Sequence, residues 1–340
     1  MKRPHAVLCV YSAVIPFLAA GFRPGLFNGW FPAWSRVISA LMSKITSPVP
    51  FPLAELAAYA AIIAFPAYWA ASFIRRRDFR RAGRVTLVWA SSVAAAFVWF
   101  WGLNYFCAPP SARMGLSPAP VTVETLISTA VYYRDGLNAA YTPYASDFRE
   151  LSRAIAGGFN SLSERYGFIS PNPAPPKRLT FGTVQSYLGI SGVYLPWTGE
   201  ACVVGDTPPP HLPATMAHEM AHRQGVGHED EASFIGILAC LESEHPFTRY
   251  SGMFYAFIHL SNAVLRNDRD AYAELWKDLD RRVIEDRIAM SLHYAKYEGP
   301  VSDAGRAVND TYLKAMQQPE GARRYGLVVD LLIAHRAAAG

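Results

Sequence analysis

Apolar residues are concentrated in three stretches within the first third of the chain. They are Ala6–Phe22, Leu53–Ile74, in which Glu55 is the one charged residue, and Val85–Phe106. An apolar run of about 18 or more residues is long enough to cross a bilayer as a helix, so the second and third stretches predict membrane spans. The first is shorter and contains Pro16. We expect it to form a third span.

The first stretch also has features of a signal peptide. Lys2 and Arg3 precede it, and the small residues Ala19, Ala20 and Gly21 close it. Because no clean A-x-A cleavage site is present, an uncleaved helix is favoured. The sequence therefore predicts a membrane anchor over residues 1–107. The expected transmembrane helices cover residues 6–22, 53–74 and 85–106.

Beyond residue 107 the pattern becomes that of one globular domain, residues 108–340. The proline-rich segment 108–120 is expected to be a stalk. Thr122 is suited to cap a helix over Val123–Tyr141, and a second helix is expected over Ala145–Tyr166, weakened by its two glycines. β-branched and aromatic residues between residues 178 and 204 predict two or three short strands.

The last third of the chain has a helical pattern from Thr248 onward. Breaks in this pattern are expected near Asn267–Asp270, Gly299–Pro300 and Gln318–Pro319. The fold class predicted for the domain is α+β, mostly helical with a small sheet. Its two cysteines, Cys202 and Cys240, have no metal-ligand spacing, and two separate buried thiols are favoured over a disulfide.

The distribution of charge predicts the orientation in the membrane. Only 17% of the residues are charged, against about a quarter in soluble proteins. The segment between the second and third spans carries six arginines, and short loops of this kind stay in the cytoplasm. Residues 108–340 are therefore expected outside, in a multi-pass protein of the cell (inner) membrane. The arginine-rich loop is too short to present a nucleic-acid surface, so the expected partners are the lipid bilayer and a substrate in the cell envelope.

The motif that carries chemistry is H-E-x-x-H, formed by His218, Glu219 and His222. Residues four apart lie on one face of a helix, so both imidazoles point the same way, as two zinc ligands require. Glu219 lies beside them as a general base. A catalytic zinc ion keeps three protein ligands and one water, so the motif predicts Zn²⁺ and a third ligand elsewhere.

Three neighbours compete for the third position. His228 would complete H-E-x-x-H-x-x-G-x-x-H, a pattern typical of metzincins. Glu229 and Glu231 begin a second helix, in which they point roughly 200° apart and cannot both face one metal. Glu229 shares its face with Ala232, Ser233 and Gly236, whereas Glu231 shares its face with apolar core residues. Glu229 is favoured, with Ser233 near enough to hydrogen-bond a ligand imidazole, and His228 is expected to point to solvent.

Several motifs together resemble a known family. They are PFPLAEL, WGLNY, GISGVYLPWTGEA, HEMAHRQG with EDEASF, RYSG and NDTYLKAMQQPEGARRYGLVVDLLIA. The chain is similar to the bacterial membrane family catalogued as domain of unknown function 3810, grouped with the zincin-like peptidases. The resemblance implies a zincin-like fold and a metal site but no substrate, and Ser233 stands where the family usually has Asn. E-x-x-A-S from Glu229 is also similar to the E-x-x-A-D/N of gluzincins, in which the first Glu binds zinc.

These features predict a membrane-anchored zinc metallopeptidase that hydrolyses peptide bonds by metal-activated water, with Glu219 as general base. Two alternatives stay open at this point. One is a non-catalytic zinc-binding sensor or scaffold in the membrane, and the other is a zinc hydrolase of cell-envelope substrates. As candidate oxyanion donors, Tyr250, His293, Tyr312 and Tyr325 remain unassigned.

Overall fold

The protein is described from a computed structural model. The structure describes residues 3–74, 79–116, 121–144, 147–316, 318–320 and 327–339. The expected arginines at 75–77 and the candidate Tyr325 lie outside these residues. Mostly helical, the chain contains a three-stranded sheet. The membrane-proximal elements are α1 (Arg3–Phe22), α2 (Phe31–Thr46), α3 (Leu53–Ile74), α4 (Phe79–Phe100) and the 3₁₀ helix η1 (Gly102–Phe106).

The remaining elements follow from residue 110. They are α5 (Pro110–Arg113), α6 (Val123–Ala140), α7 (Phe148–Arg165), β1 (Lys177–Arg178), α8 (Gly182–Tyr187), β2 (Gly192–Leu195), β3 (Glu200–Val203), α9 (Leu212–Arg223), α10 (Glu229–Leu241), α11 (Pro246–Asn267), α12 (Arg269–Lys277), α13 (Arg281–Ala295), α14 (Pro300–Ala315) and α15 (Val328–Ala339). The predicted helices at 123–141 and 145–166 correspond to α6 and α7, and the predicted strands to β1, β2 and β3.

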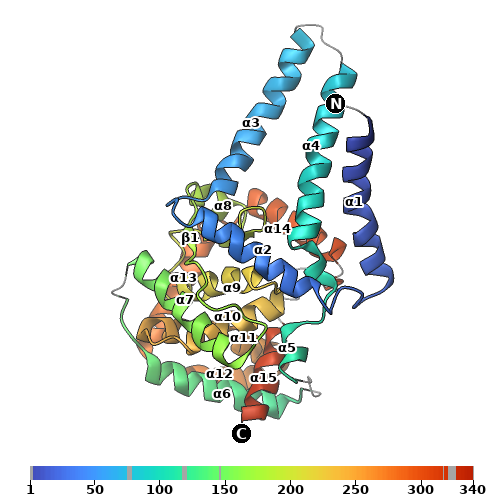
Figure 1. Ribbon diagram of the computed structural model, residues 1–340. Coiled ribbons are helices and arrows are strands. Elements are labelled where there is room, and N and C mark those ends of the chain that lie inside the picture. The colour runs from blue at the N-terminus through green and yellow to red at the C-terminus, as the bar shows by residue number, and fades with distance from the viewer. Residues whose placement is uncertain are drawn as a thin grey trace.

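Helices α1, α3 and α4 project together from one side of the molecule (Figure 1). Two of them, α3 and α4, are long and apolar enough to cross a membrane, and few of their residues are buried. Ile62 and Ile63 of α3, for example, are 66% and 71% exposed. A core helix of a soluble protein would instead bury such residues. The expected first span corresponds to α1, whose uninterrupted apolar part is the shorter Leu8–Phe22.

An unpredicted amphipathic helix, α2, lies across the base of the three projecting helices (Figure 1). After Phe31 and Pro32 at its start, its buried residues are small and polar, and Ser35, Ser39 and Ser43 recur every fourth position towards the rest of the protein. On the opposite face, large apolar side chains are exposed. They are Trp34, Val37, Leu41 and Ile45. Helix α2 therefore has one face fitted to the protein and an apolar face directed away from it.

The sheet has the order β1-β3-β2, so β2 is an edge strand among the described residues. β3 pairs in parallel with β1 and antiparallel with β2, where Tyr194 is opposite Ala201. All four residues of β3 are buried. The turn between β2 and β3 packs on α2, because a Cβ on Gly199 would lie 2.5 Å from the Ser39 carbonyl oxygen. This packing fixes the edge strand beside the membrane-proximal helices.

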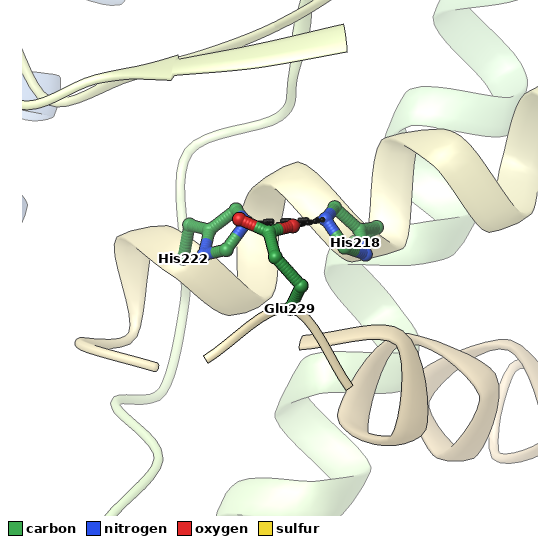
Figure 2. Close-up of side chains that lie close together, drawn as sticks. All are labelled: His218, His222 and Glu229. Carbon is green, nitrogen blue, oxygen red and sulfur yellow. Dashed lines mark hydrogen bonds and ion pairs between the residues drawn. The ribbon is translucent and has the colours of Figure 1, made fainter. Parts of the chain in front are cut away.

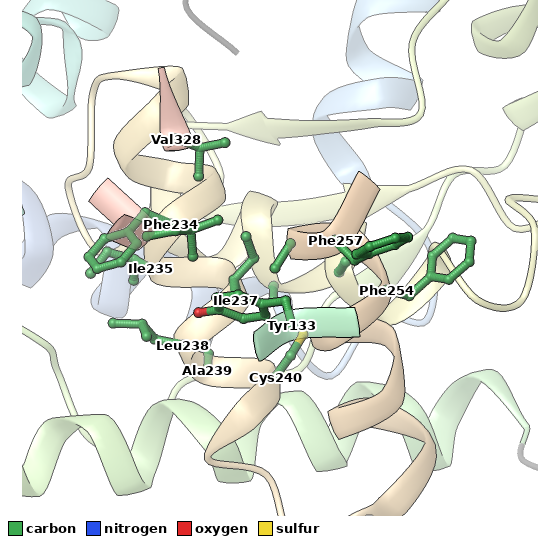
Figure 3. Packing of buried hydrophobic residues seen from close by; sticks show 14 of the residues in the cluster. Tyr133, Phe234, Ile235, Ile237, Leu238, Ala239, Cys240, Phe254, Phe257 and Val328 are labelled. Carbon is green, nitrogen blue, oxygen red and sulfur yellow. The ribbon is translucent and has the colours of Figure 1, made fainter. Parts of the chain in front are cut away.

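Helix α10 is the centre of the main apolar core. Its residues are buried from Glu229 to Cys240, and side chains of α6, α11 and α15 pack around it (Figure 3). Phe234, Phe254 and Phe257 are among the largest fully buried side chains. Cys202 and Cys240 are separate buried thiols, as predicted. Close packing on several sides fixes the position of α10 and therefore of Glu229, the polar residue at its start.

The segment after α4 is not a stalk. Pro110 and Ser111 are buried in α5, and the backbone N–H and hydroxyl of Ser111 both donate hydrogen bonds to the carboxylate of Glu231 on α10. The prediction of a free connector over 108–120 was therefore wrong for the described residues up to 116. Proline content suggested a spacer, whereas the prolines here begin a short helix that packs against the core.

Two adjacent glycines in α7 provide a matched test of the packing. A Cβ on Gly158 would lie 1.9 Å from the Ala239 carbonyl oxygen of α10, whereas a Cβ on Gly157 would meet nothing within 4 Å. We expect Gly158→Ala to destabilise the protein by about 1–3 kcal/mol through overpacking. Gly157→Ala should stabilise it by about 0.5–1 kcal/mol, because glycine costs entropy within a helix. Thermal unfolding of the detergent-solubilised protein measures both, and equal effects would contradict the packing described here.

Candidate metal centre

The candidate centre is built where α9 ends and α10 begins. Pro213 occupies the first turn of α9, where its missing N–H costs nothing. After the helix, Gly225 has φ +83°, a left-handed conformation that glycine adopts without strain. The chain reverses there, and α10 starts at Glu229. A Cβ on Gly236 would lie 2.9 Å from the backbone nitrogen of His218, so the two helices pack at very close range.

This close packing brings three buried side chains to one point. His218 and His222 lie one turn apart on α9, and the Glu229 carboxylate reaches between their imidazoles (Figure 2). Glu229 Oε2 lies 3.1 Å from His218 Nε2 and 3.5 Å from His222 Nε2. The two Nε2 atoms are 3.1 Å apart. In the plane of these three atoms, the point equidistant from all of them lies about 1.9 Å from each. Zinc bonds to His nitrogen and carboxylate oxygen are slightly longer, at about 2.0–2.2 Å. A metal ion therefore fits just outside their plane.

Hydrogen bonds orient both imidazoles. His222 Nδ1 lies 2.8 Å from the Val226 carbonyl oxygen, which can only accept, so Nδ1 carries a proton and Nε2 presents its lone pair. His218 Nδ1 lies 3.1 Å from Ser233 Oγ, one turn along α10 from Glu229. Contacts of this kind fix the tautomer and the ring direction of metal-binding histidines. The predicted closeness of Ser233 to one of the two imidazoles is confirmed.

The surroundings shift the pKa values of Glu229 and His222 in opposite directions. Burial opposes ionisation of Glu229, but His222 and hydrogen bonds from both imidazoles outweigh it and hold the pKa of Glu229 well below its usual value. For His222, burial acts against the charge of Glu229, and the net effect raises its pKa to about 9. His222 Nε2 and Glu229 Oε2 lie 3.5 Å apart, and their lone pairs repel each other unless a cation lies between them. A proton or a metal ion can supply it.

Glu219 lies apart from this group, on the side of the edge strand. A Cβ on Gly192 of β2 would lie 2.7 Å from Glu219 Oε1, so only glycine leaves room for the carboxylate. The backbone N–H of Tyr194 also donates to Glu219. Burial raises the pKa of Glu219, against opposing effects of His218 and His222. A buried carboxylate with a raised pKa suits a group that accepts and returns a proton.

A cavity of about 580 Å³ opens beside the centre. Glu219, His222 and Glu229 line one side, and β2 with the turn after it lines another. The third side is α4, which contributes Trp89, Val93 and Phe97 among others. Trp101, just after α4, donates a hydrogen bond from Nε1 to the His222 carbonyl oxygen at 2.8 Å. The end of α4 is therefore attached directly to the helix that carries the histidines.

The family model described as "Protein of unknown function (DUF3810)" matches residues 28–333. The chain belongs to this family. No curated protein and no solved structure matches the chain. In this DUF3810 protein the matched range contains α2, α3, α4, the sheet and the candidate centre. The family description names no reaction.

Of the three neighbours considered as third ligand in the DUF3810 chain, the structure brings Glu229 to the histidines. Glu231 is turned away from the histidines, as predicted, and it accepts hydrogen bonds from Ser111, which was not predicted. The prediction that His228 points to solvent was wrong, because His228 is half-buried and its Nε2 lies 3.0 Å from the Tyr105 carbonyl oxygen. The helical face that carries Glu229 could be predicted from residue spacing. The contact of His228 with Tyr105 of η1 could not, because it joins segments distant in the sequence. The role of His218, His222 and Glu229 as metal ligands stays a prediction.

One of the candidate oxyanion donors lines the cavity. Tyr312 of α14 does so, and its hydroxyl lies 3.0 Å from that of Tyr105. Burial raises the pKa of Tyr312 to about 12, which keeps the hydroxyl protonated as a donor. Tyr250 instead donates to Asp286 within the core, and His293 packs against Tyr297 away from this cavity. The contribution of α4 to the cavity wall was not predicted, since no local pattern links a membrane helix to a motif over 100 residues later.

Zinc analysis of purified variants tests the centre. We expect one zinc ion per chain, and loss of that ion in His218→Ala, His222→Ala and Glu229→Ala, because each removes one of three converging donors. Ser233→Ala should weaken zinc affinity about 10–100-fold, the usual effect of removing a group that orients a ligand.

His228→Ala is the matched control for these variants, since it removes an imidazole at the start of the same helix without touching the centre. It should retain the zinc ion. Zinc content that falls in His228→Ala as far as in Glu229→Ala would show that the third ligand is assigned wrongly.

Proposed function

We propose that the protein is a membrane-anchored zinc metallopeptidase with a zincin-like active site. The observation that supports this most strongly is the convergence of His218, His222 and Glu229, with Glu219 beside them on the same cavity. A purely structural zinc site is usually closed by four protein ligands. Here the donor set is three, the cavity is open to it, and a carboxylate faces that cavity.

The chemistry follows from the position of each side chain. Zinc, when bound, polarises the substrate carbonyl and lowers the pKa of the attacking water. Glu219 takes a proton from that water and delivers it to the leaving nitrogen as the C–N bond breaks. Tyr312 donates its hydroxyl proton in a hydrogen bond to the oxygen on which negative charge develops. β2 offers the backbone edge along which an extended substrate pairs, adjacent to Glu219.

The proposed location is the cell membrane, with the metal centre on the extracytoplasmic side. Support comes from the arginines at the tip shared by α3 and α4, and from α2, whose exposed apolar face suits the surface of a bilayer. Helices α1 and α4 run in the same direction and α3 in the opposite one (Figure 1). This arrangement fits three crossings with the amino terminus inside.

Replacing the general base tests the mechanism. Glu219→Gln keeps the shape of the side chain but cannot accept the proton, so zinc should remain bound while turnover falls by about 10² or more. Turnover is measured on a peptide library with the full-length protein in detergent or lipid, beside its zinc content. Tyr312→Phe in the same assay should lower kcat about 10²-fold with little change in KM, as for loss of one oxyanion donor.

Full activity of Glu219→Gln in that assay would remove the proposed mechanism. Zinc bound at one ion per chain, without cleavage of any library member by the wild-type protein, would favour the sensor interpretation instead.

Reporter fusions test the orientation. A reporter active only in the cytoplasm should be silent after Gly340 and active after Gly83, because the arginines beside α4 stay inside. The opposite pattern would show that the centre faces the cytoplasm.

A further inference from the structure

The candidate site lies close to the outer boundary of the hydrocarbon core if α4 crosses the membrane as proposed. From Arg84, at the arginine-rich end, to Phe100 the helix rises by about 24 Å. The hydrocarbon core of a bilayer is about 30 Å thick. Trp101 follows at once and is bonded to the backbone of His222. The metal centre is therefore held one hydrogen bond away from the outer end of a membrane span.

The cavity extends from this centre back along α4. Between Trp89 and Phe97, both of which line it, the helix rises by about 12 Å. That wall thus extends across the middle of the proposed span towards its outer end. Trp197, in the turn after β2, donates from Nε1 to the Val93 carbonyl oxygen at 3.1 Å and closes another side. Apart from tyrosines, the ionisable side chains lining this cavity are Glu219, His222 and Glu229.

The end of the cavity at Trp89 lies beside α3. The two helices contact each other through Phe65 and Trp89, whose ring centroids are 4.5 Å apart. From their shared tip they diverge towards the base of the projection (Figure 1). Trp89 also lines the cavity and is 46% exposed. An apolar chain within the bilayer can therefore approach the cavity from the side of the helices, without passing through water.

The chemistry of the edge strand identifies the kind of chain. Alternate residues of an antiparallel edge strand direct their N–H and C=O groups away from the sheet. At the depth of lipid such groups are costly to leave without partners. A polypeptide backbone satisfies them by pairing with β2, and a hydrocarbon chain cannot. The carboxylate of Glu219, against Gly192 and the N–H of Tyr194, lies where that pairing would occur.

We propose that the substrate is a membrane protein or peptide cleaved beside its transmembrane segment, with that segment entering along α4. This rests on the proposed peptidase function and adds to it the substrate class and the route of entry. The residues next to the cleaved bond pair with β2. The apolar segment lies against Trp89, Val93 and Phe97, across the middle of the bilayer.

The test uses the full-length protein in lipid vesicles with three forms of one randomised eight-residue library. In the first form the library directly adjoins a transmembrane helix, in the second a fatty acyl chain replaces the helix, and in the third it is a free soluble peptide. We expect cleavage of the first form at least tenfold faster than of the other two. Equal cleavage of the soluble form would overturn the proposal while leaving the peptidase function intact. Equal cleavage of the acylated form would show that a lipid anchor, and not a transmembrane polypeptide segment, is recognised.

A matched pair of variants tests the route. Ala94 lines the cavity on α4, whereas Ala64 is an exposed residue of α3 that does not. Ala94→Trp should lower kcat/KM for the first form at least tenfold at unchanged zinc content, and Ala64→Trp should leave it unchanged. Equal effects would rule out the route along α4.

A binding measurement separates failure of this proposal from failure of the peptidase function. A photoreactive amino acid replaces Ala94 or Ala64 in the Glu219→Gln protein, and the first library form is the probe. Stronger capture at position 94 is expected. Equal capture at the two positions would overturn the proposal, whether or not any substrate is cleaved. Preferential capture together with no cleavage by the wild-type protein would instead contradict the peptidase function.

Discussion

The contact between α9 and α10 is the constraint on which the candidate centre depends. No side chain larger than hydrogen fits at Gly236, where α10 meets the backbone of His218. At this spacing the first residue of α10, Glu229, reaches both imidazoles, and Ser233 reaches His218 one turn later. Three buried groups with lone pairs directed at one point are costly unless a cation joins them. The fold therefore holds a group of side chains that could bind a metal ion.

Helix α3 is joined to β3 and to the segment after β1 by hydrogen bonds in both directions. The carboxylate of Glu200 in β3 accepts from the backbone N–H groups of Leu53 and Ala54 at the start of α3. In return, Glu55 of α3 accepts from the backbone of Thr180 and Phe181. A carboxylate at a helix amino terminus is stabilised by the helix dipole as well. Hydrogen bonds thus connect the predicted anchor, residues 1–107, with the predicted domain, residues 108–340.

Local chemistry predicted much more of the structure than contacts between distant elements did. The spacing of His218 and His222, and the small-residue face beginning at Glu229, identified the three converging side chains. Helix caps such as Thr122 placed helix starts to within a few residues. The sequence could not predict α2 as a helix with serines on its buried face, since burial of Ser39 depends on Tyr194, 155 residues later. For the same reason the proline-rich connector was mistaken for a spacer.

Peptide cleavage and recognition of an apolar segment require different residues in the walls of the proposed cavity. Cleavage needs water and a polar centre, which α9 and α10 supply through Glu219, His222 and Glu229. Recognition of an apolar segment needs walls that exclude water, which α4 and the turn after β2 supply through aromatic side chains. Because these walls come from elements other than the two that carry the motif and Glu229, they can change without replacing the metal ligands. On this view, substrate choice depends on α4 and the β2–β3 turn, and the chemistry depends on the two central helices.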